Sequence, residues 1–253
     1  MSDKKQEKEF LSKYNIHDYD VPLTSVDIVI FTIIDDQVHV LLTKRNDFPF
    51  KNHWATPGGF VDIIKDQNIQ QTALRKLKEK TGYNVPYLEQ LGAVGNSHRD
   101  PRGWSVTITY FALVNADDVK FSDDSHWYPL DTNGEMNQQT LPNDKLAFDR
   151  RLAFDHNELI KEAFIRLRNK AQYTTIVLHV LPESFTLSEL QKSYEIILGG
   201  KLNKSGFRRR IIKSNVIEEI EGESKQTATR MAQLYKKSND SDLHFYMREI
   251  YAH

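Results

Sequence analysis

Charged side chains at positions 76, 79 and 80 are the first feature of the sequence whose spacing points to chemistry. Lys76, Glu79 and Lys80 are separated by three and four positions, so in a helix they share one face. Three carboxylates so placed can hold the divalent ions that bridge a pyrophosphate and activate water. Two of the three are lysines here, and at ~6 Å with an effective dielectric near 20 each repels a divalent ion by roughly 5 kcal/mol. We therefore predict no catalytic residue and no metal site, with magnesium bound weakly at most.

The same helix contains Arg75, four residues before Glu79. One interpretation is that both residues are the remnant of a metal-binding helix. The plainer alternative is a surface ion pair worth a few tenths of a kcal/mol. Asp62 and Asp66 lie upstream and offer replacement oxygens, so residual hydrolysis stays open as a second hypothesis.

A second candidate site is the run HRDPRG at residues 98–103, which contains Arg99, Asp100 and Arg102 just before an expected strand. The planar guanidinium groups of two arginines suit phosphate oxygens. The alternative is that Asp-Pro-Arg-Gly forms a turn without contacting any ligand.

A third candidate site is a basic segment between residues 201 and 213, which holds six basic residues and no acidic one. Phe207 and Ile211, spaced i, i+4, can anchor a helix, leaving its basic side chains free for DNA phosphates and base edges. A solvated charged face is the alternative. The predicted DNA contacts on this helix and on the hairpin after it are Lys204, Ser205, Arg208, Arg209, Arg210, Lys213, Lys225 and Arg230.

The elements expected to position the first two sites are strands around one helix. Apolar, β-branched runs at 26–33 and 38–45 predict a hairpin, and residues 104–114 predict a further strand. The helix is expected over residues 68–82, with Asn68 as its N-cap and Gly82 in the left-handed conformation that ends it.

Helices dominate from residue 155 onward. Asp155 with Glu158, and Thr186 with Glu189, have the spacing of a capping box. A third helix follows at the basic segment, and then two strands joined by a turn at residues 221–223. This order predicts a winged helix-turn-helix. We expect an α+β protein with a polar leader (1–20), a ligand-sensing domain (21–150) and a DNA-binding domain (151–253).

Composition narrows the function classes. The chain has 253 residues, no cysteine, and 34 Lys+Arg against 35 Asp+Glu. Disulfides and thiolate metal sites are therefore excluded, as is a uniformly basic nucleic-acid binder. No segment approaches the ~20 apolar residues that cross a bilayer. We expect a cytoplasmic protein that associates with the nucleoid when bound to DNA and has no membrane partner.

The segment from Pro57 to Val85 resembles the Nudix box, G-x5-E-x7-R-E-U-x-E-E-x-G-U, where U is bulky and apolar. The resemblance implies a Nudix-like α/β/α sandwich over roughly residues 20–150. The sequence departs from the box at Lys76 and Lys80, and Gln67 aligns with the expected upstream acid. The matching residues are Gly58, Gly59, Arg75, Leu77, Glu79, Gly82 and Tyr83.

The whole chain is similar to the NrtR family of Nudix-related transcriptional regulators. The similarity rests on the degenerate box, HRDPRG, and the runs LAFDH and FTLSELQKSYEIILGGKLNKSGFRRRI. It implies a homodimeric repressor of NAD-metabolism genes that binds an operator in double-stranded DNA and senses ADP-ribose or a related nucleotide, with no cofactor required. It also implies that Arg45 and Phe60 join Arg99, Asp100 and Arg102 in the ligand pocket. The alternatives are an active ADP-ribose pyrophosphatase, a regulator of pentose utilisation, and a module whose basic helix binds protein or RNA.

Overall fold

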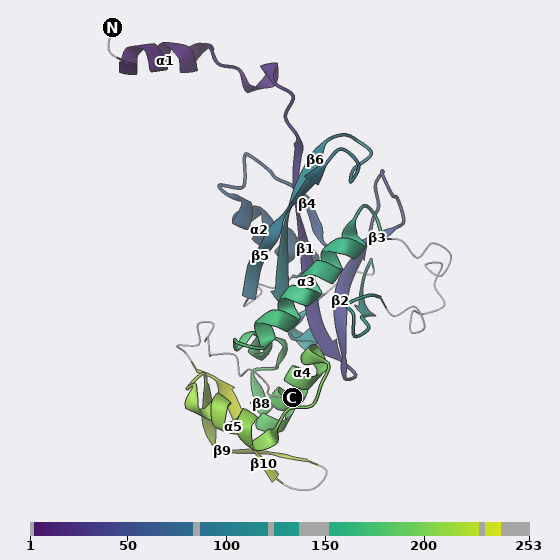
Figure 1. Cartoon of the computed structure of the whole chain (residues 1–253), viewed down its shortest axis with the longest axis vertical. Helices are drawn as coiled ribbons and strands as arrows, with labels where there is room; N and C mark the ends of the chain where they lie inside the picture. Colours follow the sequence, from purple (N-terminus) through teal and green to yellow (C-terminus); the bar gives the residue numbers. More distant parts are fainter. Residues whose placement is uncertain (1–2, 83–86, 121–123, 137–151, 228–230, 239–253) are drawn as a thin grey trace, which may run out of the picture.

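A computed structural model describes residues 3–82, 87–120, 124–136, 152–227 and 231–238 of the chain (Figure 1). Figure 1 shows a thin N-terminal arm, a central sheet flanked by helices, and a smaller C-terminal part at the opposite end from the arm. The arm contains helix α1 (Asp3–Lys13) and the 3-10 turn η1 (Ile16–Asp18), and neither buries any residue. The predicted polar leader is thus exposed but partly helical.

A mixed seven-stranded sheet forms the central part. The predicted hairpin is confirmed, since its two strands pair antiparallel with Ile34 opposite Gln37. The first strand also pairs in parallel with the strand predicted at 104–114, which connects the two sequence-distant segments. The strands are β1 (Leu23–Ile34), β2 (Gln37–Lys44), β3 (Trp54–Ala55), β4 (Gly58–Phe60), β5 (Tyr87–Asn96), β6 (Ser105–Leu113) and β7 (Ser125–Pro129), and the main order is β3-β2-β1-β6-β5.

Helix α2 (Ile69–Thr81) begins and ends where the sequence predicts. The Asn68 side chain accepts a hydrogen bond from the backbone N–H of Gln71, and Gly82 has a φ of 65°. These groups satisfy the unpaired backbone donors and acceptors that every helix has at its ends. The boundaries of α2 therefore follow from local chemistry.

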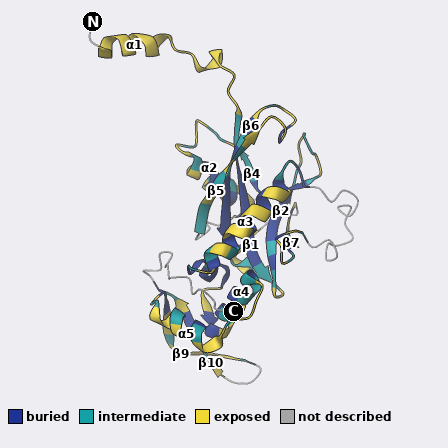
Figure 2. Ribbon diagram, in the orientation of Figure 1, coloured by how far each residue is buried: buried dark blue, intermediate teal, exposed yellow. Residues whose placement is uncertain are grey.

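The two faces of the sheet are covered by different helices because successive side chains of a strand point to opposite faces. Ile28 of β1 belongs to the core that includes Leu77 of α2. Phe31 belongs to the other core and meets the ring of Phe164, with 6.2 Å between centroids. Phe164 lies on helix α3 (His156–Ala171), which is buried on one side and exposed on the other (Figure 2). The predicted α/β/α sandwich is confirmed.

Helix α3 belongs to the sandwich, and its predicted N-terminal cap is not formed. Its apolar face packs on the sheet, so it is the third layer of the sandwich, although a domain division at 150/151 assigns it to the C-terminal part. The division itself falls next to residues outside the described part of the chain. The predicted capping box at Asp155 is wrong: Asp155 makes no capping hydrogen bond, because its carboxylate is bound to Arg99.

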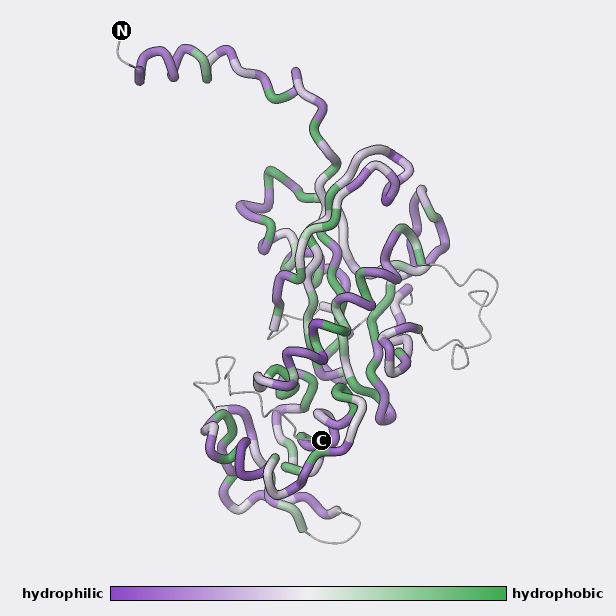
Figure 3. Tube along the Cα trace, viewed as in Figure 1, coloured by the Kyte–Doolittle hydropathy of each residue, from purple (hydrophilic) through white to green (hydrophobic). Residues whose placement is uncertain are grey.

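The C-terminal part is a small helical domain with a three-stranded sheet, and it has the predicted order of helix, helix and hairpin. Its first helix keeps the predicted capping box of Thr186 and Glu189. In Figure 3 the green, apolar segments run mainly through the central strands and inner helices. The elements are η4 (Ile176–Val180), β8 (Ser184–Thr186), α4 (Leu187–Leu198), α5 (Lys204–Lys213), β9 (Ile217–Gln226) and β10 (Met231–Lys237).

The predicted turn at residues 221–223 is wrong, because β9 continues through it to Gln226. The pairing with β10 shifts register between Ser224, opposite Gln233, and Glu219, opposite Tyr235, so residues 220–223 of β9 form an irregularity within the strand. Gly222 has a φ of 75°, which a glycine adopts without steric cost. Gly222 therefore marks a bulge within β9 and not the end of the strand.

Within the described ranges, no helix is both long and apolar enough to cross a lipid bilayer.

Candidate functional site

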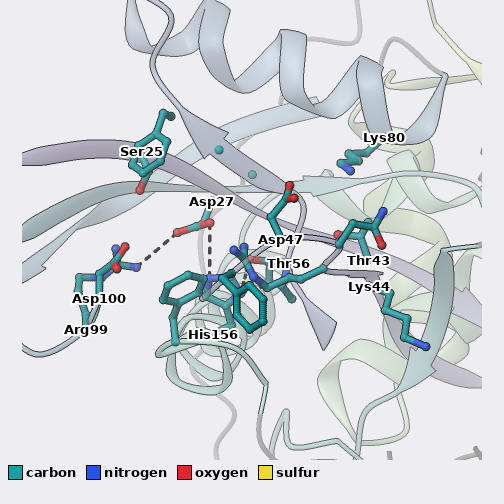
Figure 4. A pocket seen from close by; sticks show the side chains of 18 of the residues that line it. Ser25, Asp27, Thr43, Lys44, Asp47, Thr56, Lys80, Arg99, Asp100 and His156 are labelled. Atoms are coloured by element: carbon teal, nitrogen blue, oxygen red, sulfur yellow. Dashed lines mark hydrogen bonds and ion pairs between the residues drawn. The ribbon is translucent and has the colours of Figure 1, made fainter. Parts of the chain in front are cut away.

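A cavity of about 350 Å³ opens beside strands β1, β2 and β4 at the end of the sandwich where α3 begins (Figure 4). It gathers residues from the ends of β2 and β4, from the loop between β5 and β6, and from the start of α3. All five residues predicted to bind ligand line it, although they are spread over 58 positions of sequence: Arg45, Phe60, Arg99, Asp100 and Arg102. Their role in binding remains a prediction, whereas their proximity is a feature of the fold.

Arg99 lines the cavity and is only 8% exposed. It donates from Nε and Nη2 to the two carboxylate oxygens of Asp155, at 2.9 and 2.8 Å. Its Nη2 also reaches Asp27 of β1 at 3.4 Å. A buried guanidinium held by two carboxylates has little charge left for an anion, so Arg99 ties the sheet to the start of α3.

Arg102 lies at the rim with its guanidinium 4.9 Å from the centre of the Phe60 ring. It forms a bidentate pair with Asp100, at 3.0 and 2.7 Å. This pair raises the pKa of Arg102, and despite the opposing effect of burial the pKa of Asp100 is lowered through the same contacts. The HRDPRG run thus forms a turn that is also part of the cavity wall, and its contact with a ligand stays a prediction.

Arg45 is the least neutralised arginine of the cavity. Its Nε donates to the carbonyl of Pro49 at 2.9 Å, and its guanidinium lies 4.8 Å from the centre of the Phe154 ring. Burial, and then repulsion from Arg102, lower its pKa. The charge of an anion in the cavity would offset both effects, which makes Arg45 suitable for a phosphate.

His156 is a buried residue of the cavity lining that the sequence did not predict as a site residue. Its Nδ1 accepts a hydrogen bond from the backbone N–H of Thr56 at 3.0 Å, so its proton lies on Nε2, 3.6 Å from Asp27 Oδ1 (Figure 4). Burial lowers the pKa of His156, which keeps the imidazole neutral. The sequence signal was available in the run LAFDH, whose Phe154 also lines the cavity.

Gly58 allows β4 to approach this cluster closely. A Cβ atom at this position would lie 2.4 Å from the carbonyl oxygen of Val26 and 2.5 Å from Asp27 Oδ1. The first glycine of the Pro-Gly-Gly segment is therefore needed because any side chain there would collide with β1 and its buried carboxylate.

The charged face of α2 does not suit a divalent ion. One carboxylate oxygen of Glu79 accepts a hydrogen bond from Arg75 at 3.1 Å, and the other accepts one from Lys76 at 3.0 Å. Asp66, one of the two possible replacement ligands, accepts Arg75 on both oxygens, which holds its pKa far below the usual range. Asp62 binds backbone N–H groups of its own turn and pairs with Lys65 at 3.2 Å. No group of three possible metal ligands occurs in the described part of the chain.

Helix α5 presents the predicted basic surface at the other end of the molecule. Asn203 caps it, while Phe207 and Ile211 are buried as anchors. Exposed side chains follow the helix on its outer side: Lys204, Ser205, Arg209 and Lys213.

Two of the predicted DNA contacts are partly engaged within the domain. Arg208 donates to Ser188 Oγ of α4 at 3.3 Å, and its Nε is buried. Lys225 of the hairpin pairs with Glu189 at 2.6 Å. Arg210 is half-buried, and Arg230 lies outside the described residues. The charges most accessible to a phosphate backbone are therefore on the outer side of α5.

The fold and the two sites define a class of protein: a Nudix sandwich with a polar cavity, joined through α3 to a winged helix with a basic recognition helix. The NUDIX domain model matches residues 23–156, and the model of the NrtR DNA-binding winged helix domain matches residues 177–236. The chain belongs to the NrtR family, so the predicted resemblance is confirmed.

Named relatives agree with this assignment. The ADPR responsive transcriptional repressor NtrR of Acinetobacter baylyi is 46% identical over 244 residues, which cover 94% of this chain and 92% of that protein. NrtR of Shewanella oneidensis complexed with a 27mer DNA is 39% identical, with a TM-score of 0.75 over 85% of this chain and 93% of that one. Its NUDIX domain complexed with ADP ribose is 39% identical, with a TM-score of 0.52 over 66% and 99% of the two chains.

Proposed function

We propose that this protein is a DNA-binding transcriptional repressor whose Nudix domain senses ADP-ribose or a closely related nucleotide. The observation that carries the proposal is a cavity with incompletely neutralised cations in the same chain as a winged helix with an exposed basic helix. Five cationic residues and three aspartates line the cavity, which favours an anionic ligand. The relative from Acinetobacter baylyi is described as an ADP-ribose-responsive repressor, which supports the same function here.

Helix α3 is the element that joins the two sites. At its start, the N-cap residue Asp155 binds Arg99 of the cavity, and His156 accepts a hydrogen bond from Thr56. Near its other end, Arg168 donates to the carbonyl of Ile197 in α4 at 3.0 Å and to that of Thr132 at 2.6 Å. A ligand that shifts the first turn of α3 would therefore move the base of the winged helix, and a few kcal/mol of differential affinity is enough to change the population that binds DNA.

On DNA we propose a homodimer that places two copies of α5 in successive major grooves, about 34 Å apart, on a near-palindromic operator. The exposed Lys204, Arg209 and Lys213 would contact phosphates and base edges. Genes of NAD metabolism are the proposed targets, with pentose utilisation as the alternative.

We further propose that the Nudix domain binds its ligand without hydrolysing it. Catalysis by this fold depends on carboxylates that gather divalent ions, and both acids nearest the helix face, Glu79 and Asp66, are bound to cations of the protein itself. The rival function is an ADP-ribose pyrophosphatase with the C-terminal domain used only for dimerisation. Hydrolysis of ADP-ribose at ordinary enzyme rates in magnesium would support that rival.

The experiment is a gel shift on DNA from upstream of the neighbouring genes, with and without ADP-ribose. We expect a specific complex that ADP-ribose dissociates. The Arg209→Ala variant should bind more weakly and lower the salt slope of log K by about 1, as expected for one lost phosphate contact. Lys192→Ala is the matched control, since Lys192 is an exposed cation of α4 that pairs with Asp36. An Arg209→Ala variant with unchanged affinity and salt slope would refute the recognition surface.

A further inference from the structure

One cation of the cavity comes from the helix that carries metal ligands in Nudix hydrolases. Lys80 is the only residue of α2 that lines the cavity (Figure 4), and it occupies one of the carboxylate positions of the Nudix box. It is exposed and makes no ion pair with any other described residue. Its ammonium group is therefore available to a ligand.

The neighbouring lysine is held in a different way. The aliphatic chain of Lys76 crosses β4 so closely that a Cβ on Gly59 would lie 2.9 Å from Lys76 Cε. Its Nζ pairs with Glu79 at 3.0 Å. Lys76 thus neutralises the one carboxylate left on this face, which leaves the charge of Lys80 uncompensated.

Two of the three arginines that line the cavity are already paired with carboxylates of the protein. Arg99 is held by Asp155 and Asp27, and Arg102 is held by Asp100. Among the described lining residues, the cations without an ion pair are Lys44, Arg45 and Lys80. Arg45 directly follows β2 and Lys80 belongs to α2, so an anion between them would be contacted on two sides.

We propose that Lys80 takes over the charge-neutralising role of a divalent ion, so that the cavity binds a diphosphate ester such as ADP-ribose without metal. This inference rests on the proposed function, because it assumes that the cavity is the effector site. An ammonium group neutralises phosphate charge and donates hydrogen bonds, but it does not acidify a bound water as a metal ion does. A lysine in place of a carboxylate therefore accounts both for ligand binding without metal and for the proposed lack of hydrolysis.

The test is calorimetric titration of the full-length protein with ADP-ribose, once with EDTA and once with magnesium. The dissociation constant of the unaltered protein should agree within about twofold between the two buffers. Lys80→Glu should weaken binding in EDTA by at least tenfold, equivalent to about 1.4 kcal/mol, and magnesium should restore part of the loss. Lys80→Met should be weakened in both buffers.

Lys78→Glu is the matched control, because Lys78 is exposed on the same helix, undergoes the same charge change and does not line the cavity. It should bind as the unaltered protein does. If the unaltered protein needs magnesium to bind ADP-ribose, or if Lys80→Met binds it normally, the inference is wrong while the proposed function survives. If ADP-ribose binds in neither buffer, the proposed function itself fails, and the inference fails with it.

Discussion

The ion pair between Arg99 and Asp155 allows a quantitative test of how the cavity is attached to α3. Arg99→Met leaves Asp27, which is 7% exposed, without its cation and beside a neutral imidazole. Removing one partner of a buried ion pair costs about 3–5 kcal/mol of the free energy of unfolding. Asp155→Asn keeps one acceptor for Arg99, which still has Asp27 as its partner, so we expect a cost of only about 1–2 kcal/mol.

Urea unfolding of the two single variants and the double variant measures the interaction between these residues. Because Arg99 and Asp155 touch through two hydrogen bonds, the double variant should lose less than the sum of the single losses, by about 1–2 kcal/mol. Arg102→Met combined with Asp155→Asn is the control. Arg102 pairs with Asp100, so this double variant should be additive within about 0.5 kcal/mol. Additivity for Arg99 with Asp155 would refute the buried connection.

Three further predictions concern other contacts. Burial lowers the pKa of His179 to about 4, so below pH ~6.5 the unfolded chain binds the proton more readily and stability falls as pH falls. The loss at pH 5 should reach about 2 kcal/mol in urea unfolding, and His179→Phe should reduce it. Arg168→Met removes the hydrogen bond to α4, so ADP-ribose should bind normally in calorimetry yet dissociate DNA less well in gel shifts. Gly58→Ala should destabilise the protein by about 1–3 kcal/mol in thermal unfolding, because its Cβ would strike Asp27.

Local chemistry made some elements readable from the sequence alone. Asn68 and Gly82 mark the two ends of α2, and Thr186 with Glu189 marks the start of α4. Each motif is readable because it hydrogen-bonds the free backbone groups of a helix end within a few residues. The same spacing failed at Asp155, where a guanidinium 56 positions away competes for the carboxylate. Such competition depends on the tertiary fold, which the motif does not encode.

Strand β5 illustrates what periodicity missed. The burial of β5 is intermediate along most of its length, without the alternation that marks a half-buried strand. It lies at one end of the strand order and is identified by its pairing with β6, from Tyr87 opposite Leu113 to Asn96 opposite Ser105. Pairing between segments so far apart is a non-local property of the fold.

The candidate ligand residues came from a family resemblance, and the fold brings all five together around one cavity. The sequence did not reveal which charges are free. Two lining arginines are neutralised by buried or half-buried aspartates, and Arg208 of α5 turns toward Ser188. Availability of a charge depends on its partners, so it required the structure.

The most direct test of the central claim is to follow DNA release and ADP-ribose integrity in the same sample. Fluorescence anisotropy of labelled operator DNA reports release, and chromatography of the same mixture in magnesium reports how much ADP-ribose remains. We predict that DNA dissociates as ADP-ribose is added and that the nucleotide stays intact. DNA that remains bound while ADP-ribose is consumed at ordinary enzyme rates would contradict the account.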